Sequence, residues 1–164
     1  MQDTNFTIEL VTRVNYHLFD DMVYWRMKGV ELTQEEKKVD RSNEFTEVYM
    51  ELEHPGFYSY SALCEGRFVG WISMMYTPKN ARRRWRKGVL YIDELWTAPE
   101  FRRKGIATEL MKKAYDCQKE TGAVEVRVYV GDDNIVAQEL YKKCGMQVIS
   151  KAIYMKSQET QLGR

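Results

Sequence analysis

Basic residues and a glycine gather at the start of a predicted helix, in the run Arg102-Arg103-Lys104-Gly105-Ile106-Ala107. The first backbone N–H groups of a helix have no partner inside it and carry partial positive charge. Basic side chains there oppose the helix dipole unless an anion is bound, and a glycine lets a ligand approach the backbone closely. The run therefore predicts a site for an anion such as a pyrophosphate.

A second candidate for chemistry is the pair Asp93-Glu94, which interrupts the otherwise apolar residues 89–97. Burial and mutual repulsion raise the pKa of a carboxyl group, which suits it to accept and release protons. Successive strand residues face opposite sides, so only one of the two should face a cleft unless a β-bulge reorients them. The competing interpretation is a strand-end pair in which one charge is solvated and the other forms an ion pair.

The elements that would hold these residues follow from hydrophobic spacing, capping residues and turn signals. Asn15 can cap a helix that runs to about Lys28. Thr33 and Glu36 resemble a capping box at the start of a second helix, which runs in one or more pieces toward Glu53. The other predicted elements are a first strand at 6–14, a hairpin of strands at 57–64 and 67–76 around Glu65-Gly66, strands at 89–97 and 123–130, helices at 104–120 and 135–143, and one or two closing strands at 146–156.

Composition limits the class of protein. With 164 residues, of which 44% are hydrophobic and 30% charged, the chain suits one soluble globular domain over residues 1–164. The three cysteines are scattered and lack metal-ligand spacing, which favours reduced thiols in a cytoplasmic protein and no metal site. The sequence shows no signal-peptide pattern and no apolar run long enough to span a bilayer, so no membrane partner is expected. The order of strands and helices favours an α/β fold (α+β mixed sheet) with helices on both faces.

Two stretches of the chain together resemble the GNAT family of N-acetyltransferases. Asp93 to Ala107 is similar to that family's acetyl-coenzyme A (acetyl-CoA) signature, an Arg or Gln, two residues, a Gly, one residue and a Gly or Ala, set after a strand and a turn that contains Pro. Asn134 to Met146 is similar to the family's "Asn…Ala…Leu-Tyr…Gly-Phe" helix, with Met146 where Phe is usual. The close match covers residues 89–149. The resemblance implies a mostly antiparallel, twisted central sheet that splays between its fourth and fifth strands.

The same resemblance implies which residues hold acetyl-CoA. Backbone N–H groups at the turn and helix start would bind the pyrophosphate, with Arg102 adding charge. The backbone of the strand before the turn would pair with the pantetheine arm, and Asn134 commonly contacts the coenzyme as well. The expected coenzyme-binding set is Leu95, Trp96, Thr97, Arg102, Arg103, Lys104, Gly105, Ile106, Ala107, Thr108 and Asn134.

Acetylating an amine also requires proton transfer, because a primary ammonium group has a pKa of about 10 and must lose a proton to react. Asp93 and Glu94 rank nearly equal as the base; similarity to polyamine acetyltransferases favours Asp93 as base and Glu94 as amine binder, with Glu125 a weaker candidate. Tyr141 lies seven residues after Asn134, on the same helix face. Family members often use this tyrosine to protonate the coenzyme thiolate; the competing interpretation is a core tyrosine that anchors the helix.

The expected activity is acetyl transfer from acetyl-CoA to a primary amine of a small molecule, such as a polyamine or an aminoglycoside, directly within a ternary complex. The first two helices usually wall the acceptor pocket in this family, so Tyr24 and Trp25 join Glu94 as expected substrate contacts. A protein amine as acceptor, and a coenzyme-binding regulatory module without catalysis, are the alternatives. Family members often dimerise, so a homodimer stays open.

The segment Lys79 to Lys87 is the most basic part of the chain and has no counterpart in the family pattern. An exposed loop of solvated charges is the favoured interpretation. Contact with an acidic partner, with the coenzyme 3′-phosphate or with nucleic acid through the arginines around Trp85 is the alternative. The net charge of +1 argues against nucleic acid as a partner.

Overall fold

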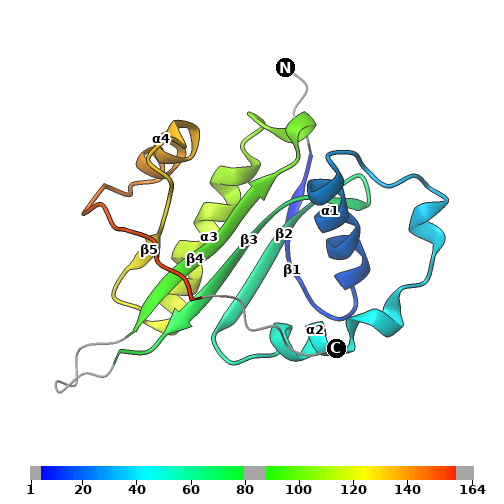
Figure 1. Ribbon diagram of the computed structural model, residues 1–164, viewed down its shortest axis with the longest axis horizontal. Coiled ribbons are helices and arrows are strands. Elements are labelled where there is room, and N and C mark those ends of the chain that lie inside the picture. Colours follow the sequence, from blue (N-terminus) through cyan, green and yellow to red (C-terminus); the bar gives the residue numbers. More distant parts are fainter. Residues whose placement is uncertain (1–4, 80–87, 158–164) are drawn as a thin grey trace.

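Five strands form one sheet in the order β1-β2-β3-β4-β5 (Figure 1). The computed structural model describes residues 5–79 and 88–157, so most of the basic segment Lys79 to Lys87 lies outside the described residues. The elements in chain order are β1 (Thr7–Leu10), α1 (Tyr16–Lys28), η1 (Glu36–Lys38), η2 (Ser42–Phe45), α2 (Thr46–Leu52), β2 (Phe57–Cys64), β3 (Arg67–Thr77), β4 (Val89–Thr97), η3 (Pro99–Phe101), α3 (Ile106–Thr121), β5 (Val126–Val128) and α4 (Ile135–Lys143).

The pairing of β4 with β5 sets the sheet apart from a simple meander. Neighbouring strands from β1 to β4 are antiparallel, whereas β4 and β5 are parallel. That parallel pairing covers only Leu90–Ile92 against Val126–Val128. Beyond Ile92, β4 has no strand on its β5 side among the described residues, which confirms the predicted splay between the fourth and fifth strands.

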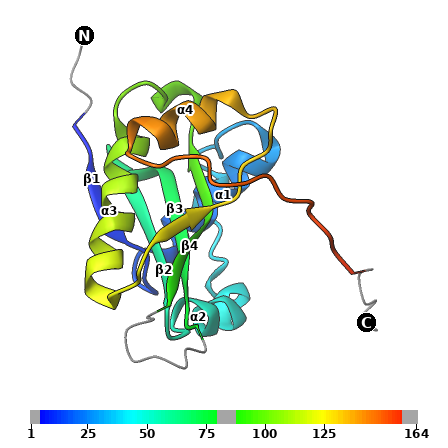
Figure 2. The same cartoon turned by 90° about the vertical axis from the view of Figure 1, so that its left-hand side faces the viewer.

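Helices cover both faces of the sheet, as predicted. Figure 2 shows α3 against one face and α1 with α2 on the other. On α3, the buried residues Ile106, Leu110 and Ala114 recur every four positions, so one stripe of this helix packs against the sheet. A second cluster, which includes Met22 of α1 and Phe45, fills the opposite face.

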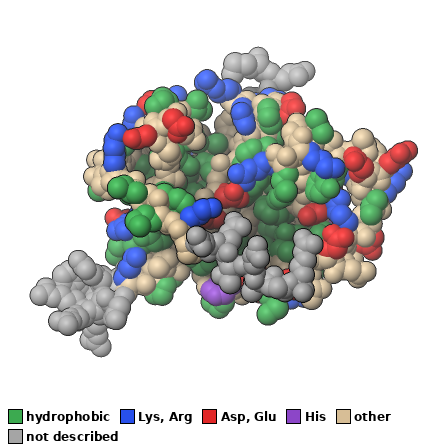
Figure 3. Space-filling view, viewed as in Figure 1, with side chains coloured by type: hydrophobic (Ala, Val, Ile, Leu, Met, Phe, Trp, Pro, Cys, Tyr) green, Lys and Arg blue, Asp and Glu red, His purple; other side chains and the backbone are tan. Residues whose placement is uncertain are grey.

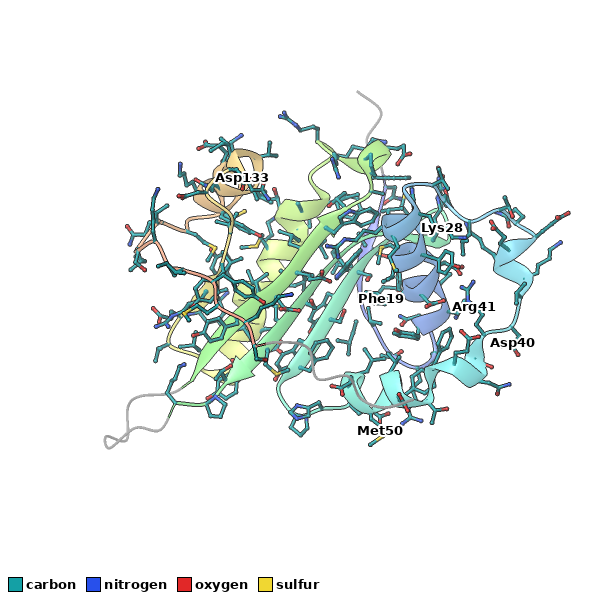
Figure 4. All side chains as sticks on the ribbon, viewed as in Figure 1. Phe19, Lys28, Asp40, Arg41, Met50 and Asp133 are labelled. Carbon is teal, nitrogen blue, oxygen red and sulfur yellow. The ribbon has the colours of Figure 1, made fainter. Side chains whose placement is uncertain are left out.

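The second predicted helix is broken, and the reason lies in its composition. Thr33 and Glu36 form the reciprocal capping box, with Thr33 N–H 2.8 Å from a Glu36 carboxylate oxygen and Glu36 N–H 3.2 Å from Thr33 Oγ1. Only the single turn η1 follows, because no residue of η1 is buried and helices gain most of their stability from packing. The connection is held instead by Arg41, which lies beside α1 (Figure 4) and pairs with Asp20 and Asp21.

The prediction of closing strands at 146–156 is wrong for the described residues. No strand forms between residues 146 and 157, and the apolar side chains of Ile149, Ile153 and Tyr154 are exposed. Figure 2 shows this stretch leaving the body of the molecule. Strand propensity alone does not form a strand, because the pleated backbone needs a partner for its hydrogen bonds.

Among the described residues, every helix is too short or too polar to span a membrane.

Candidate active site

The turn before α3 presents a row of free backbone donors. Gly105 (φ 83°) and Arg103 (φ 63°) both adopt left-handed backbone conformations, and these bend the chain into the helix. Glu109 N–H donates to Gly105 O at 3.1 Å. Within residues 5–79 and 88–157, the N–H groups of residues 103–108 have no such acceptor. The residues predicted to bind a pyrophosphate therefore form a cradle of donors at the positive end of a helix.

Buried side chains on either side hold this cradle in place. Phe101 and Ile106 are 8% and 1% exposed and anchor the turn in the core. Arg102 Nε donates to Thr97 O at 3.1 Å, which ties the turn back to β4. At Gly70 of β3, a Cβ would lie 2.9 Å from Trp96 O and 3.2 Å from Ile106 Cγ2, so only glycine permits this close approach of β3 to β4 and α3.

The splay leaves an open strand edge that leads from the cradle into the sheet. Leu95, Trp96 and Thr97 pair with β3 on one side and have no strand on the other among the described residues. Alternate residues of an edge strand point N–H and C=O groups outward, so this edge can pair with an extended ligand. The space-filling view shows the molecule hollowed between its α4 side and its α1 side, with hydrophobic side chains in the hollow (Figure 3).

A β-bulge at Asp93 places both candidate carboxylates on the same face of β4. Ser73 of β3 pairs with Glu94, whereas the next residue, Met74, pairs with Ile92, so Asp93 is the extra residue. Ile92 packs in the cluster on the α3 side, so alternation turns Asp93 to the α1 side, where its side chain is exposed. Glu94 also faces α1, because its Oε1 lies 2.6 Å from Nη1 of Arg26. The reorientation that a bulge would cause therefore occurs.

Asn134 and Tyr141 lie at the start and near the end of α4. Asn134 is the N-cap: its Oδ1 accepts the Ala137 N–H at 3.2 Å, which leaves its amide NH2 without an acceptor among the described residues. Tyr141 packs against the main core cluster, and burial raises the pKa of its phenol. A raised pKa keeps the phenol protonated at neutral pH, as a proton donor requires.

The two aromatic residues of α1 that were expected to contact the acceptor differ in their exposure to solvent. Tyr24 is 37% exposed on α1, with Nζ of Lys28 4.3 Å from its ring centre. Trp25 is only 4% exposed and packs against Trp96 and Phe101, so it supports the core beneath the site. Glu125, the weaker candidate for a base, is paired with Arg127. Among the described residues no cluster of His, Cys, Asp and Glu could hold a metal.

Sequence reasoning missed Arg26. This residue joins α1 to β4 across 68 positions of sequence, and its guanidinium carbon lies 5.1 Å from the centre of the Trp71 ring. An arginine on a helix carries no local signal for such a contact; only the packing of α1 across the sheet reveals it.

Known proteins share both the sequence pattern and this architecture. The "Acetyltransferase (GNAT) family" model matches residues 20–146. The chain is 31% identical over 68 residues to "Thialysine N-epsilon-acetyltransferase" of Bos taurus, an alignment that covers 42% of this chain and 40% of that protein. It spans less than two thirds of the length of the curated relatives it matches.

Solved structures of acetyltransferases have the same fold. A complex of AAC(6')-Iy with the bisubstrate analogue CoA-S-monomethyl-acetylneamine superimposes with a TM-score of 0.73 at 12% identity, covering 94% of this chain and 99% of the other. An aminoglycoside acetyltransferase from an uncultured soil metagenomic sample, in complex with trehalose, gives a TM-score of 0.75 at 16% identity, over 98% and 100% of the two chains. At these identities the likeness shows the fold, and the family model adds the sequence pattern. The chain belongs to the GNAT acetyltransferase family.

Proposed function

We propose that this chain, as one domain over residues 1–164, transfers the acetyl group of acetyl-CoA to a primary amine of a small molecule such as a polyamine or an aminoglycoside. The observation that carries the proposal is the continuity of the site: the cradle of free N–H groups opens onto the free edge of β4, and that edge leads to two carboxylates. The names of the structural neighbours support a small acceptor, since they include aminoglycoside acetyltransferases and a bisubstrate complex.

The coenzyme would lie along this path in an extended form. Backbone N–H groups of residues 103–108 would bind its pyrophosphate, with positive charge from Arg102, Arg103 and Lys104. Leu95, Trp96 and Thr97 would pair with the pantetheine amides, as an added strand pairs with a sheet edge. The amide NH2 of Asn134 would supply a further donor from the α4 side. In this arrangement the thioester would lie toward the start of the splay, next to Asp93 and Glu94.

On the way from ammonium to amide, the nitrogen loses two protons and the departing sulfur gains one. The amine nitrogen attacks the thioester carbonyl, an amide C–N bond forms, and the C–S bond breaks to release the coenzyme thiolate. Asp93 is the better placed base, since Glu94 is already paired with Arg26; it would take the ammonium proton directly or through water. Tyr141 would donate its proton to the thiolate and regain one from the nitrogen as the amide forms, directly or through water, so the one remaining proton leaves from Asp93 to solvent.

The test is a thiol-release assay with acetyl-CoA and a panel of primary amines, run beside calorimetric measurement of coenzyme A binding. We expect coenzyme binding and the release of one thiol per acetylated amine. Replacing Asp93, Glu94 and Tyr141 together should abolish turnover and leave coenzyme affinity within about two-fold. Coenzyme binding without turnover on any amine would support a regulatory module instead, and turnover only on protein amines would contradict the small acceptor.

A further inference from the structure

A fixed positive charge lies beside the carboxylates of the candidate site. Arg26 of α1 reaches the sheet so that its Nη1 is 2.6 Å from Glu94 Oε1, and both side chains are 41% exposed. The guanidinium group also rests on the Trp71 ring at 5.1 Å from its centre. Trp71 itself is 1% exposed and packs against Trp96. The arginine is therefore held by an ion pair on one side and by a buried aromatic ring on the other.

This arrangement leaves hydrogen-bonding capacity unused on Arg26. A guanidinium group has five N–H donors in a planar fork. Among the described residues, Glu94 is the only hydrogen-bond acceptor recorded for it. The remaining donors belong to a partly exposed group, so they can meet a ligand with little loss of side-chain entropy.

The positive charge of Arg26 and the negative charge of Asp93 favour an acceptor that carries one negative and one positive group. With Glu94 neutralised by Arg26, Asp93 supplies the negative charge for an ammonium group. A polycation would bring further positive charge toward Arg26 and compete with it for Glu94. A carboxylate, by contrast, matches the fork of the guanidinium in a bidentate pair. Asp93 and Glu94 are adjacent on one face of the strand, so the two subsites are neighbours.

We propose that Arg26 recognises a carboxylate on the acceptor, so that the substrate is an amino acid or similar small molecule with a primary amine and a carboxylate. This inference rests on the proposed transfer to a primary amine of a small molecule and, within that class, favours an acceptor with a carboxylate over a polycation such as a polyamine or an aminoglycoside. Arg26 binds the carboxylate through its free N–H donors, Glu94 holds the arginine in place, and the amine lies toward Asp93 and the thioester.

The experiment compares matched acceptors, lysine with cadaverine, its decarboxylated counterpart, and lysine with its methyl ester, which masks the carboxylate. We expect the wild-type protein to favour lysine over both partners by about 10- to 100-fold in kcat/KM, as a charged hydrogen-bonded pair supplies. Arg26→Gln should remove this preference by raising KM for lysine and should not lower kcat/KM for cadaverine. Arg26→Lys, which keeps the charge without the fork, should retain part of the preference.

Arg13 offers a matched control. It is likewise a partly exposed arginine paired with a glutamate, Glu53, and stacked on an aromatic ring, that of Tyr49 at 4.9 Å. Arg13→Gln should leave the preference for lysine unchanged, and coenzyme A binding reports whether each variant is folded. Equal effects of Arg26→Gln on lysine and cadaverine, or a wild-type preference for cadaverine, would overturn the inference while the amine acetyltransferase stands. Coenzyme binding without turnover on any amine would overturn the proposed function itself.

Discussion

Replacing Gly105 with alanine tests whether the turn before α3 holds a phosphate group. Gly105 has a φ of +83°, and a Cβ built there meets no heavy atom within 4 Å. The cost is therefore backbone strain alone, about 1–2 kcal/mol for an L-residue in this region. A smaller conformational entropy of the unfolded chain offsets about 0.4–1 kcal/mol of that cost. We expect the free energy of unfolding to fall by about 1 kcal/mol, and the melting temperature by about 2–4 °C.

Gly29 provides the control, because it has a φ of +77° and its Cβ would also meet nothing within 4 Å. It ends α1 and is not part of the cradle. Both alanine variants should lose similar stability in chemical denaturation. Only Gly105→Ala should weaken coenzyme A binding in calorimetry, by about ten-fold or more, because Gly105 lies within the run of N–H donors at residues 103–108 and both the strain and the added methyl group act on that run. Equal coenzyme affinity in the two variants would refute the assignment of this turn to the pyrophosphate.

Substitutions at three further positions separate chemistry from stability. Tyr141→Phe should lower kcat by about 100-fold without changing coenzyme affinity; because burial raises the pKa of Tyr141, wild-type kcat should show no alkaline decline from this group below a pH of about 10. Asn134→Ala should cost about 1 kcal/mol of unfolding free energy by removing the bond to Ala137 N–H, and Asn134→Asp should retain the cap; denaturant titration distinguishes them. Burial raises the pKa of Tyr16 from its ordinary value of 10.0 to about 12, so the unfolded chain loses this proton at a lower pH than the folded one. The stability present below pH 10.0 should therefore decline between pH 10.0 and about 12, and Tyr16→Phe should make that decline shallower in alkaline denaturation curves.

Local signals predicted the elements that bear the site. The helix at 135–143 was predicted within its observed bounds, because Asn134 is a good N-cap and Cys144-Gly145 ends the helical pattern. The strand at 89–97 was likewise correct, since its apolar run has turn residues on both sides. The turn of the hairpin forms at Glu65 and Gly66, which both have positive φ as a two-residue hairpin loop requires.

Contacts between distant residues could not be predicted. The bulge at Asp93 depends on how β4 aligns with β3, and the pairing of Arg26 with Glu94 depends on where α1 crosses the sheet. The closing strands were predicted from composition, yet whether 146–156 forms a strand depends on a partner edge. The homodimer, the cytoplasmic location and the role of the segment Lys79 to Lys87 stay predictions.

The extra residue Asp93 shifts the in-and-out alternation of side chains along β4 by one position. Before it, Leu90 and Ile92 face the α3 side; after it, Glu94 and Trp96 face α1 and Leu95 faces the α3 side. Deleting Asp93 would make Ile92 and Glu94 consecutive in a regular ladder, so Glu94 would stay opposite Ser73 on the α1 side and Leu95 on the α3 side. A deletion of Asp93 should therefore be compatible with the pairing of β4 and β3, and its cost should fall on turnover through loss of the proposed base.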